Sequence, residues 1–158
     1  MQKNDRQKTI AELKRKIRKD EIEKRLLKVC PNLEYRFLNR EDTNELERVL
    51  WDKINRTDIQ RSFPTNKHEA IQHLNKIKEE WILCEELLLI HEESSEVGAL
   101  ILNAKNAWEN INEILDFISY EKRESILTGG LILVSRDLES GVCILHEEYD
   151  DSLISWGF

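Results

Sequence analysis

Two stretches of this sequence end in the same three residues, a histidine followed by two glutamates. One run, LLLIHEE, ends at His91-Glu92-Glu93, and the other, CILHEE, ends at His146-Glu147-Glu148. If the apolar residues before them form neighbouring strands, two imidazoles and four carboxylates would share one rim of a sheet. Such a rim could bind a divalent cation or act as an acid/base pair, so a metal-assisted hydrolase using His91/Glu92 and His146/Glu147 is one alternative. Polar residues also occur at strand ends simply because these reach solvent, and of the functional interpretations we favour an acidic binding rim.

The remaining motifs do not indicate catalysis. His68 and His73 are one position too far apart for the HExxH zinc motif, which places both histidines on one helix face. The glycines form neither a phosphate-binding loop nor a nucleophile elbow. Cys30, Cys84 and Cys143 match no zinc or disulfide pattern. We therefore predict that the protein is not an enzyme, with no catalytic residue, no metal and no cofactor.

The net charge of −7 hides a division of the chain into a basic and an acidic part. Residues 1–29 contain 11 Lys/Arg and 5 Asp/Glu, whereas the rest contains 13 basic and 26 acidic residues. A field of that sign repels phosphate backbones and attracts basic proteins. We expect nucleic acid to be an unlikely partner of the body. A regulatory protein that touches nucleic acid through the basic N-terminal helix is a second alternative.

The C-terminal region combines carboxylates with aromatic residues. From Asp137 to the end there are six acids and no lysine or arginine, and Trp156 follows them as the best candidate for an exposed aromatic. Aromatic anchors surrounded by charges of one sign are typical of protein interfaces. The sequence therefore predicts a surface for a basic protein partner made of these residues: Glu147, Glu148, Tyr149, Asp150, Asp151, Trp156, Glu92 and Glu93.

Hydrophobic periodicity predicts a single α+β domain over residues 1–158, with N-terminal helices and an antiparallel sheet of about four to six strands packed by helices. Helix-start signatures occur at Thr9, Asp20, Asp42, Asn66 and Asn103. The basic segment 1–29 is one bent helix or two short ones. The expected helices are 9–29, 43–55, 67–80 and 104–119. The expected strands are 87–91, 97–102, 131–135 and 142–147, with further strands at 33–39, in WILC (81–84) and in the C-terminal tail.

The composition also bears on where the protein works. No run approaches the length of a membrane span, and the charged N-terminus lacks the apolar core of a secretory signal. Free cysteines inside apolar runs favour a reducing compartment. We expect a cytoplasmic protein with no membrane partner; its oligomeric state is left open.

The C-terminal half, from about Trp81 to Phe158, resembles the small acidic immunity proteins of bacterial polymorphic-toxin and contact-dependent growth-inhibition systems. The resemblance lies in the layout of helices, an apolar sheet and the final hairpin with its acidic, aromatic tail, LILVSRDLESGVCILHEEYDDSLISWGF. It implies a non-enzymatic inhibitor that neutralises a cognate basic, nuclease-like toxin by occluding the toxin's active site with acidic side chains.

Overall fold

The fold is α+β, as the sequence predicts. The computed structural model describes residues 2–55, 60–62, 67–81, 84–118, 132–146 and 151–157. In chain order the elements are α1 (Gln2–Val29), β1 (Tyr35–Phe37), α2 (Arg40–Ile54), β2 (Gln60–Ser62), α3 (Lys67–Glu80), β3 (Glu86–Ile90), α4 (Ser94–Val97), β4 (Leu100–Asn103), α5 (Ala104–Glu109), α6 (Ile111–Phe117), β5 (Ile132–Ser135), β6 (Gly141–His146) and β7 (Asp151–Trp156).

The described strands form one sheet in the order β1-β4-β3-β5-β6-β7-β2, and every neighbouring pair is antiparallel. This sheet has seven strands, one more than the upper end of the predicted range, because the short β2 pairs with β7. The tail is a full strand rather than a short edge strand, since β7 lies between β6 and β2.

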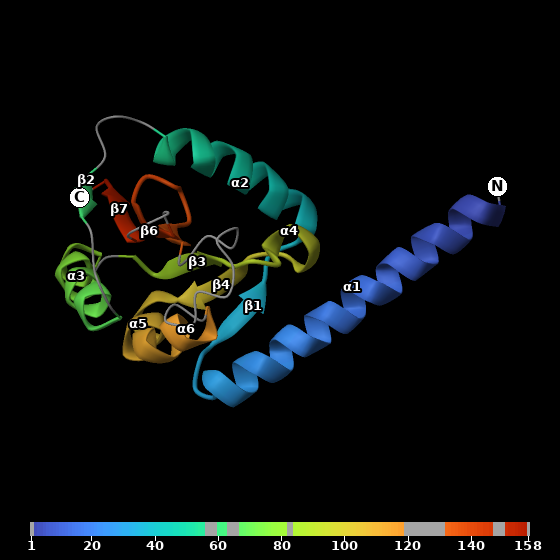
Figure 1. Cartoon of the computed structure of the whole chain (residues 1–158), viewed down its shortest axis with the longest axis horizontal. Coiled ribbons are helices and arrows are strands. Elements are labelled where there is room, and N and C mark those ends of the chain that lie inside the picture. The colour runs from blue at the N-terminus through green and yellow to red at the C-terminus, as the bar shows by residue number, and fades with distance from the viewer. Residues whose placement is uncertain are drawn as a thin grey trace.

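Helices cover both faces of the sheet (Figure 1). Leu87 and Leu89 of β3 point into a core shared with α3, α5, α6 and the end of α1, whereas Leu88 and Ile90 point into a second core under α2. Alternate residues of a strand face opposite sides of a sheet, so a central strand covered on both sides must be apolar at every position. That is why the chain has continuous apolar runs here.

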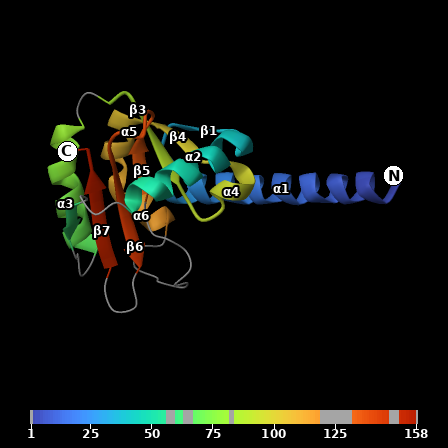
Figure 2. The ribbon, with the colours of Figure 1, turned by 90° about the horizontal axis from the view of Figure 1, so that it is seen from above.

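The basic segment is one helix of 28 residues, not two. The signatures at Thr9 and Asp20 do not mark helix starts; inside α1, the Thr9 hydroxyl donates to the Asp5 carbonyl oxygen at 2.9 Å. Ile22 and Leu26 are the buried residues of α1, and the N-terminal part extends beyond the body in both ribbon views (Figures 1 and 2).

Three other predictions need correction. The helix expected over 104–119 is divided at Asn110 into α5 and α6, and α2 is capped by Asn39, whose side chain accepts from the Asp42 N–H. The segment WILC (81–84) is not a strand at the two residues that the structure describes. Trp81 is a turn residue after α3, and Cys84 precedes β3. The connection from β3 to β4 contains the helical turn α4. The signature at Asn66 lies outside the described residues.

Adjacent leucines of α1 test how this helix is docked. Leu26 is fully buried and Leu27 is 71% exposed. Leu26→Ala is expected to lower the free energy of unfolding by about 2–5 kcal/mol because it leaves a cavity between helix and body. Leu27→Ala, the control, should change it by less than about 0.5 kcal/mol. Urea titration of dilute protein measures both, and equal effects would contradict the docking.

Candidate functional site

His91 does not stand on an open rim. It is buried, its Nε2 lies 3.0 Å from the Gly98 carbonyl oxygen, and its Nδ1 accepts from the Glu93 N–H at 3.2 Å. An Nδ1 that accepts leaves the proton on Nε2, so the ring is a neutral donor to Gly98. Gly98 has φ 98°, and a Cβ there would collide with the Leu38 carbonyl oxygen, so this turn requires glycine.

The environment of His91 keeps the ring neutral. Burial lowers the pKa of His91 to about 4, with a further lowering from the nearby positive charge of Arg25, and the Gly98 hydrogen bond opposes this in part. Both ring nitrogens are committed to the loop between β3 and β4. The structure therefore gives His91 a role in holding this loop, not one of contacting a substrate or ion.

The backbones of His91, just after β3, and His146, the last residue of β6, lie at the same end of the sheet, but β3 and β6 are not neighbours. β3 and β6 run in the same direction with β5 between them. Ile90 of β3 pairs with Ile132 of β5, which in turn pairs with Cys143 of β6, three residues before His146. Glu92 is exposed and Glu93 is half-buried. The described residues contain no group of three side chains able to hold a metal ion. Residues 147–150 and the side chains of His146 and Asp151 lie outside the described part of the chain.

Trp156 lies at the opposite end of β7 from Asp151, about 17 Å away at the usual rise per residue. It is half-buried, packs on Gly141 so closely that a Cβ there would collide with the indole, and donates from Nε1 to the Leu138 carbonyl oxygen at 3.1 Å. The predicted partner surface is thus divided: the structure does not bring Trp156 together with Glu92, Glu93 and Asp151.

Instead, the tryptophans gather around the β5–β6 hairpin (136–140). Trp81 donates from Nε1 to the Ser140 hydroxyl at 2.5 Å and its ring lies 5.8 Å from that of Trp108. Trp156 contacts the hairpin from the other side of the sheet. Trp51, 40% exposed, is on the last turns of α2, where the Lys53 amine donates to the Leu138 carbonyl oxygen at 3.0 Å. We call this region the hairpin end.

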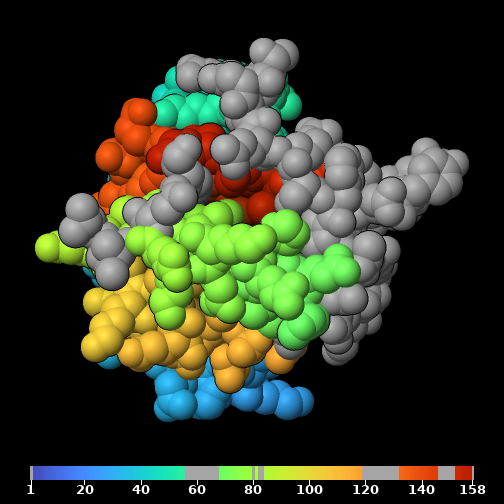
Figure 3. All heavy atoms as spheres, turned by 90° about the vertical axis from the view of Figure 1, so that its left-hand side faces the viewer, coloured from blue at the N-terminus to red at the C-terminus, as the bar shows by residue number. Residues whose placement is uncertain are grey.

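A hollow of about 670 Å³ opens at the hairpin end between α3 and α5, two helices that lie side by side on the face shown in Figure 3. The buried indoles of Trp81 and Trp108 contribute to its floor. The Trp108 Nε1–H is buried and meets no acceptor in the described structure. The hollow therefore offers a bound group an apolar floor inside a ring of charged residues. It is lined by Asn75, Lys78, Glu79, Trp81, Cys84, Ala104, Lys105, Trp108 and Glu109.

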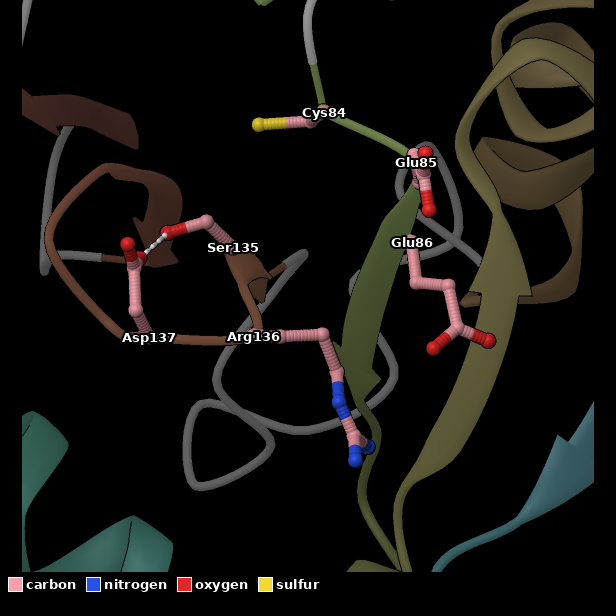
Figure 4. A pocket seen from close by; sticks show the side chains of 6 residues that line it. All are labelled: Cys84, Glu85, Glu86, Ser135, Arg136 and Asp137. Atoms are coloured by element: carbon pink, nitrogen blue, oxygen red, sulfur yellow. Dashed lines mark hydrogen bonds between the residues drawn. The ribbon is translucent and has the colours of Figure 1, made fainter.

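A smaller hollow of about 340 Å³ shares Cys84 with the first (Figure 4). Its lining comes from two segments, Cys84–Glu86 before and at the start of β3 and Ser135–Asp137 at the end of β5. The Ser135 hydroxyl donates to Asp137 at 2.6 Å and keeps the pKa of that carboxyl below its usual value. Burial, and then the Asp137 charge, raise the pKa of the Cys84 thiol. A protonated thiol is a poor nucleophile.

Comparison with known proteins identifies the family. The model of the family described as YxiF protein matches residues 22–156. The chain belongs to the YxiF family. A curated member, named uncharacterized protein YxiF of Bacillus subtilis (strain 168), is 30% identical over 150 residues, which cover 93% of this chain and 95% of that protein. No solved structure matches. The YxiF family match begins at Ile22, the first residue of α1 that is buried against the body.

Sequence reasoning missed the convergence of the tryptophans. Trp81 and Trp108 are buried in the core, but nothing in the periodicity of the sequence joins them to one hairpin. The signal in the sequence that could have indicated this convergence is the position of the tryptophans near the ends of their helices and strands. Trp51 and Trp81 stand near the C-terminal ends of helices and Trp156 ends the last strand, and the strand order then decides that these ends meet.

The low pKa of His91 predicts a loss of stability in mild acid. The unfolded chain binds a proton at His91 near pH 6.5 and the folded chain only near pH 4. Stability is therefore complete above pH 6.5 and falls as the pH drops toward 4, by about 3 kcal/mol for this group. Unfolding measured across that range should give a flatter profile for His91→Gln. The exposed His68→Gln should follow the wild type, and parallel profiles for all three would contradict the assignment.

Proposed function

We propose that this YxiF-family protein is a non-catalytic inhibitor of the immunity type, which binds a basic, nuclease-like toxin and covers the toxin's active site. One observation carries the proposal: three tryptophans (Trp81, Trp108 and Trp156) and several carboxylates gather at the hairpin end. Interfaces are enriched in tryptophan. The net acidity of the chain beyond residue 29 has the sign required to compete with a nucleic acid.

The two kinds of residue have different tasks in this proposal. Glu85, Glu109 and Glu139 are exposed and raise the rate of encounter with a basic protein. Trp51, together with the floor of the larger hollow, provides apolar area that becomes desolvated on binding.

The hydrolase alternative receives less support, because His91 is neutral and its ring nitrogens are engaged by the backbone. The acidic stretch around Glu147 remains a second candidate for the contact surface. The ends of β6 and β7 that flank it, His146 and Asp151, lie at the other end of the sheet from Trp156, so an experiment can separate the two candidates.

The function is tested by co-expression. A toxin domain encoded beside this gene should arrest growth when expressed alone, and this chain should restore growth by forming a stable one-to-one complex. Full growth arrest in the presence of the soluble chain, with no complex on gel filtration, would contradict the proposal.

Two charge-reversal variants locate the surface, each changing the net charge equally. One replaces Glu79, Glu85, Glu109 and Glu139 at the hairpin end by lysine, and the other replaces Glu147, Glu148, Asp150 and Asp151. The first is expected to slow association with the toxin domain about tenfold or more and to weaken its salt dependence. The second should have a smaller effect. Thermal unfolding of both variants controls for folding, and unchanged association in both would refute the acidic mechanism.

A further inference from the structure

The N-terminal part of α1 exposes a row of large apolar side chains. Ile10, Leu13, Ile17 and Leu27 are 47%, 55%, 57% and 71% exposed. With Trp51 they are the exposed large hydrophobic residues of the described chain. Ile22 and Leu26, which dock α1 on the body, lie on the other side of the helix, since each residue turns the helix by 100°. The body therefore leaves this row uncovered.

All four exposed residues fall on the seam of one heptad register. With Ile10 and Ile17 at a, Leu13 and Leu27 occupy d. The residues that contact the body occupy the outer positions b, c and f. Arg18 pairs with Glu96 at 2.9 Å, the Lys19 amine lies 4.7 Å from the Phe37 ring, and the Arg25 guanidinium lies 4.2 Å from the Phe117 ring. The helix thus has one face fitted to the body and the opposite face patterned for a second helix.

We propose that α1 pairs with α1 of a second copy of this chain as a parallel, two-stranded coiled coil. β-Branched residues at a with leucine at d favour two parallel strands, and the sequence has isoleucine at both apolar a positions and leucine at both apolar d positions. The N-terminal part of α1 extends beyond the body in both ribbon views (Figures 1 and 2). Because the body packs on the outer face of α1, the two bodies of such a pair would sit on opposite sides of it and leave the seam open.

Charges beside the seam select the parallel arrangement. In a parallel pair, g residues face the e residues of the next heptad on the other helix. Lys16 then faces Glu21 of the second copy, and Glu23 faces Lys28, which gives four attractive pairs across the dimer. The antiparallel arrangement with the greatest overlap would instead place Lys14 against Lys14 and Lys16 against Lys16.

Polar residues on the seam set the strength of the association. Lys3, Arg6, Asp20 and Lys24 also occupy a or d positions, and residues 1–19 contain eight basic and two acidic residues. Repulsion between the basic ends makes the dimer reversible, and salt screens this repulsion. Association is therefore expected at micromolar or higher concentration and should strengthen as salt is added, the opposite of a complex with nucleic acid.

Sedimentation equilibrium of the full chain tests the proposal. The mass should rise from 18.8 kDa toward twice that value with concentration. Ile17→Lys should weaken self-association at least about tenfold, and Asp20→Leu, which adds leucine at d, should strengthen it at least about tenfold. Glu12→Leu makes the same change on the outer face and should have no effect. A monomer at every concentration, or equal gains from Asp20→Leu and Glu12→Leu, would overturn the proposal.

Orientation is tested by cross-linking. Arg6→Cys in a Cys84→Ser background places a thiol at d, where a parallel pair brings it beside its equivalent in the second copy. Rapid oxidation to a covalent dimer is expected, whereas Ala11→Cys on the outer face should remain monomeric. If only Ala11→Cys cross-links, or if added nucleic acid binds α1 more tightly than α1 binds itself, the parallel dimer is wrong.

Discussion

The burial of β3 on both faces is the constraint on which the rest of this structure depends. Its residues Leu87, Leu88 and Leu89 are almost completely buried, and its two neighbours, β4 and β5, satisfy the hydrogen bonds of both its edges. A strand covered on both faces requires two independent apolar layers. One layer comes from α3, α5, α6 and the end of α1, and the other comes from α2. The placement of nearly every helix follows from this requirement.

The same constraint determines where polar residues can act. Since both faces of the sheet are covered, solvent reaches the central strands at their ends, and the two ends differ. At one end His91 is buried in the loop that leads to β4. At the other, the β5–β6 hairpin receives hydrogen bonds from Trp81, Lys53 and Trp156, and two hollows that share Cys84 open nearby. Recognition by the hairpin end and pairing through α1 would use surfaces that do not compete.

The sequence predicts much of the fold and less of the site, for physical reasons. The apolar runs at 87–91, 131–135 and 142–147 reveal buried strands because such strands allow no polar position. The division at Asn110 was not visible, since the apolar residues of α5 and α6 continue the same helical periodicity across it. Helix α1 has an apolar row on each of two opposite sides, so the sequence does not indicate which row packs on the body. Trp156 and Asp151 are close in sequence, but a six-residue strand carries them to opposite ends of the sheet.

The pairing of β2 with β7 has a consequence for synthesis of the chain. Residues 60–62 of β2 form hydrogen bonds with residues 153–155 of β7. During synthesis, β2 therefore leaves the ribosome long before the strand with which it pairs. Until β7 emerges, the outer edge of β6 has unpaired backbone groups, which can join a strand from another nascent chain. A chain stalled just before Asp151 would therefore expose that edge.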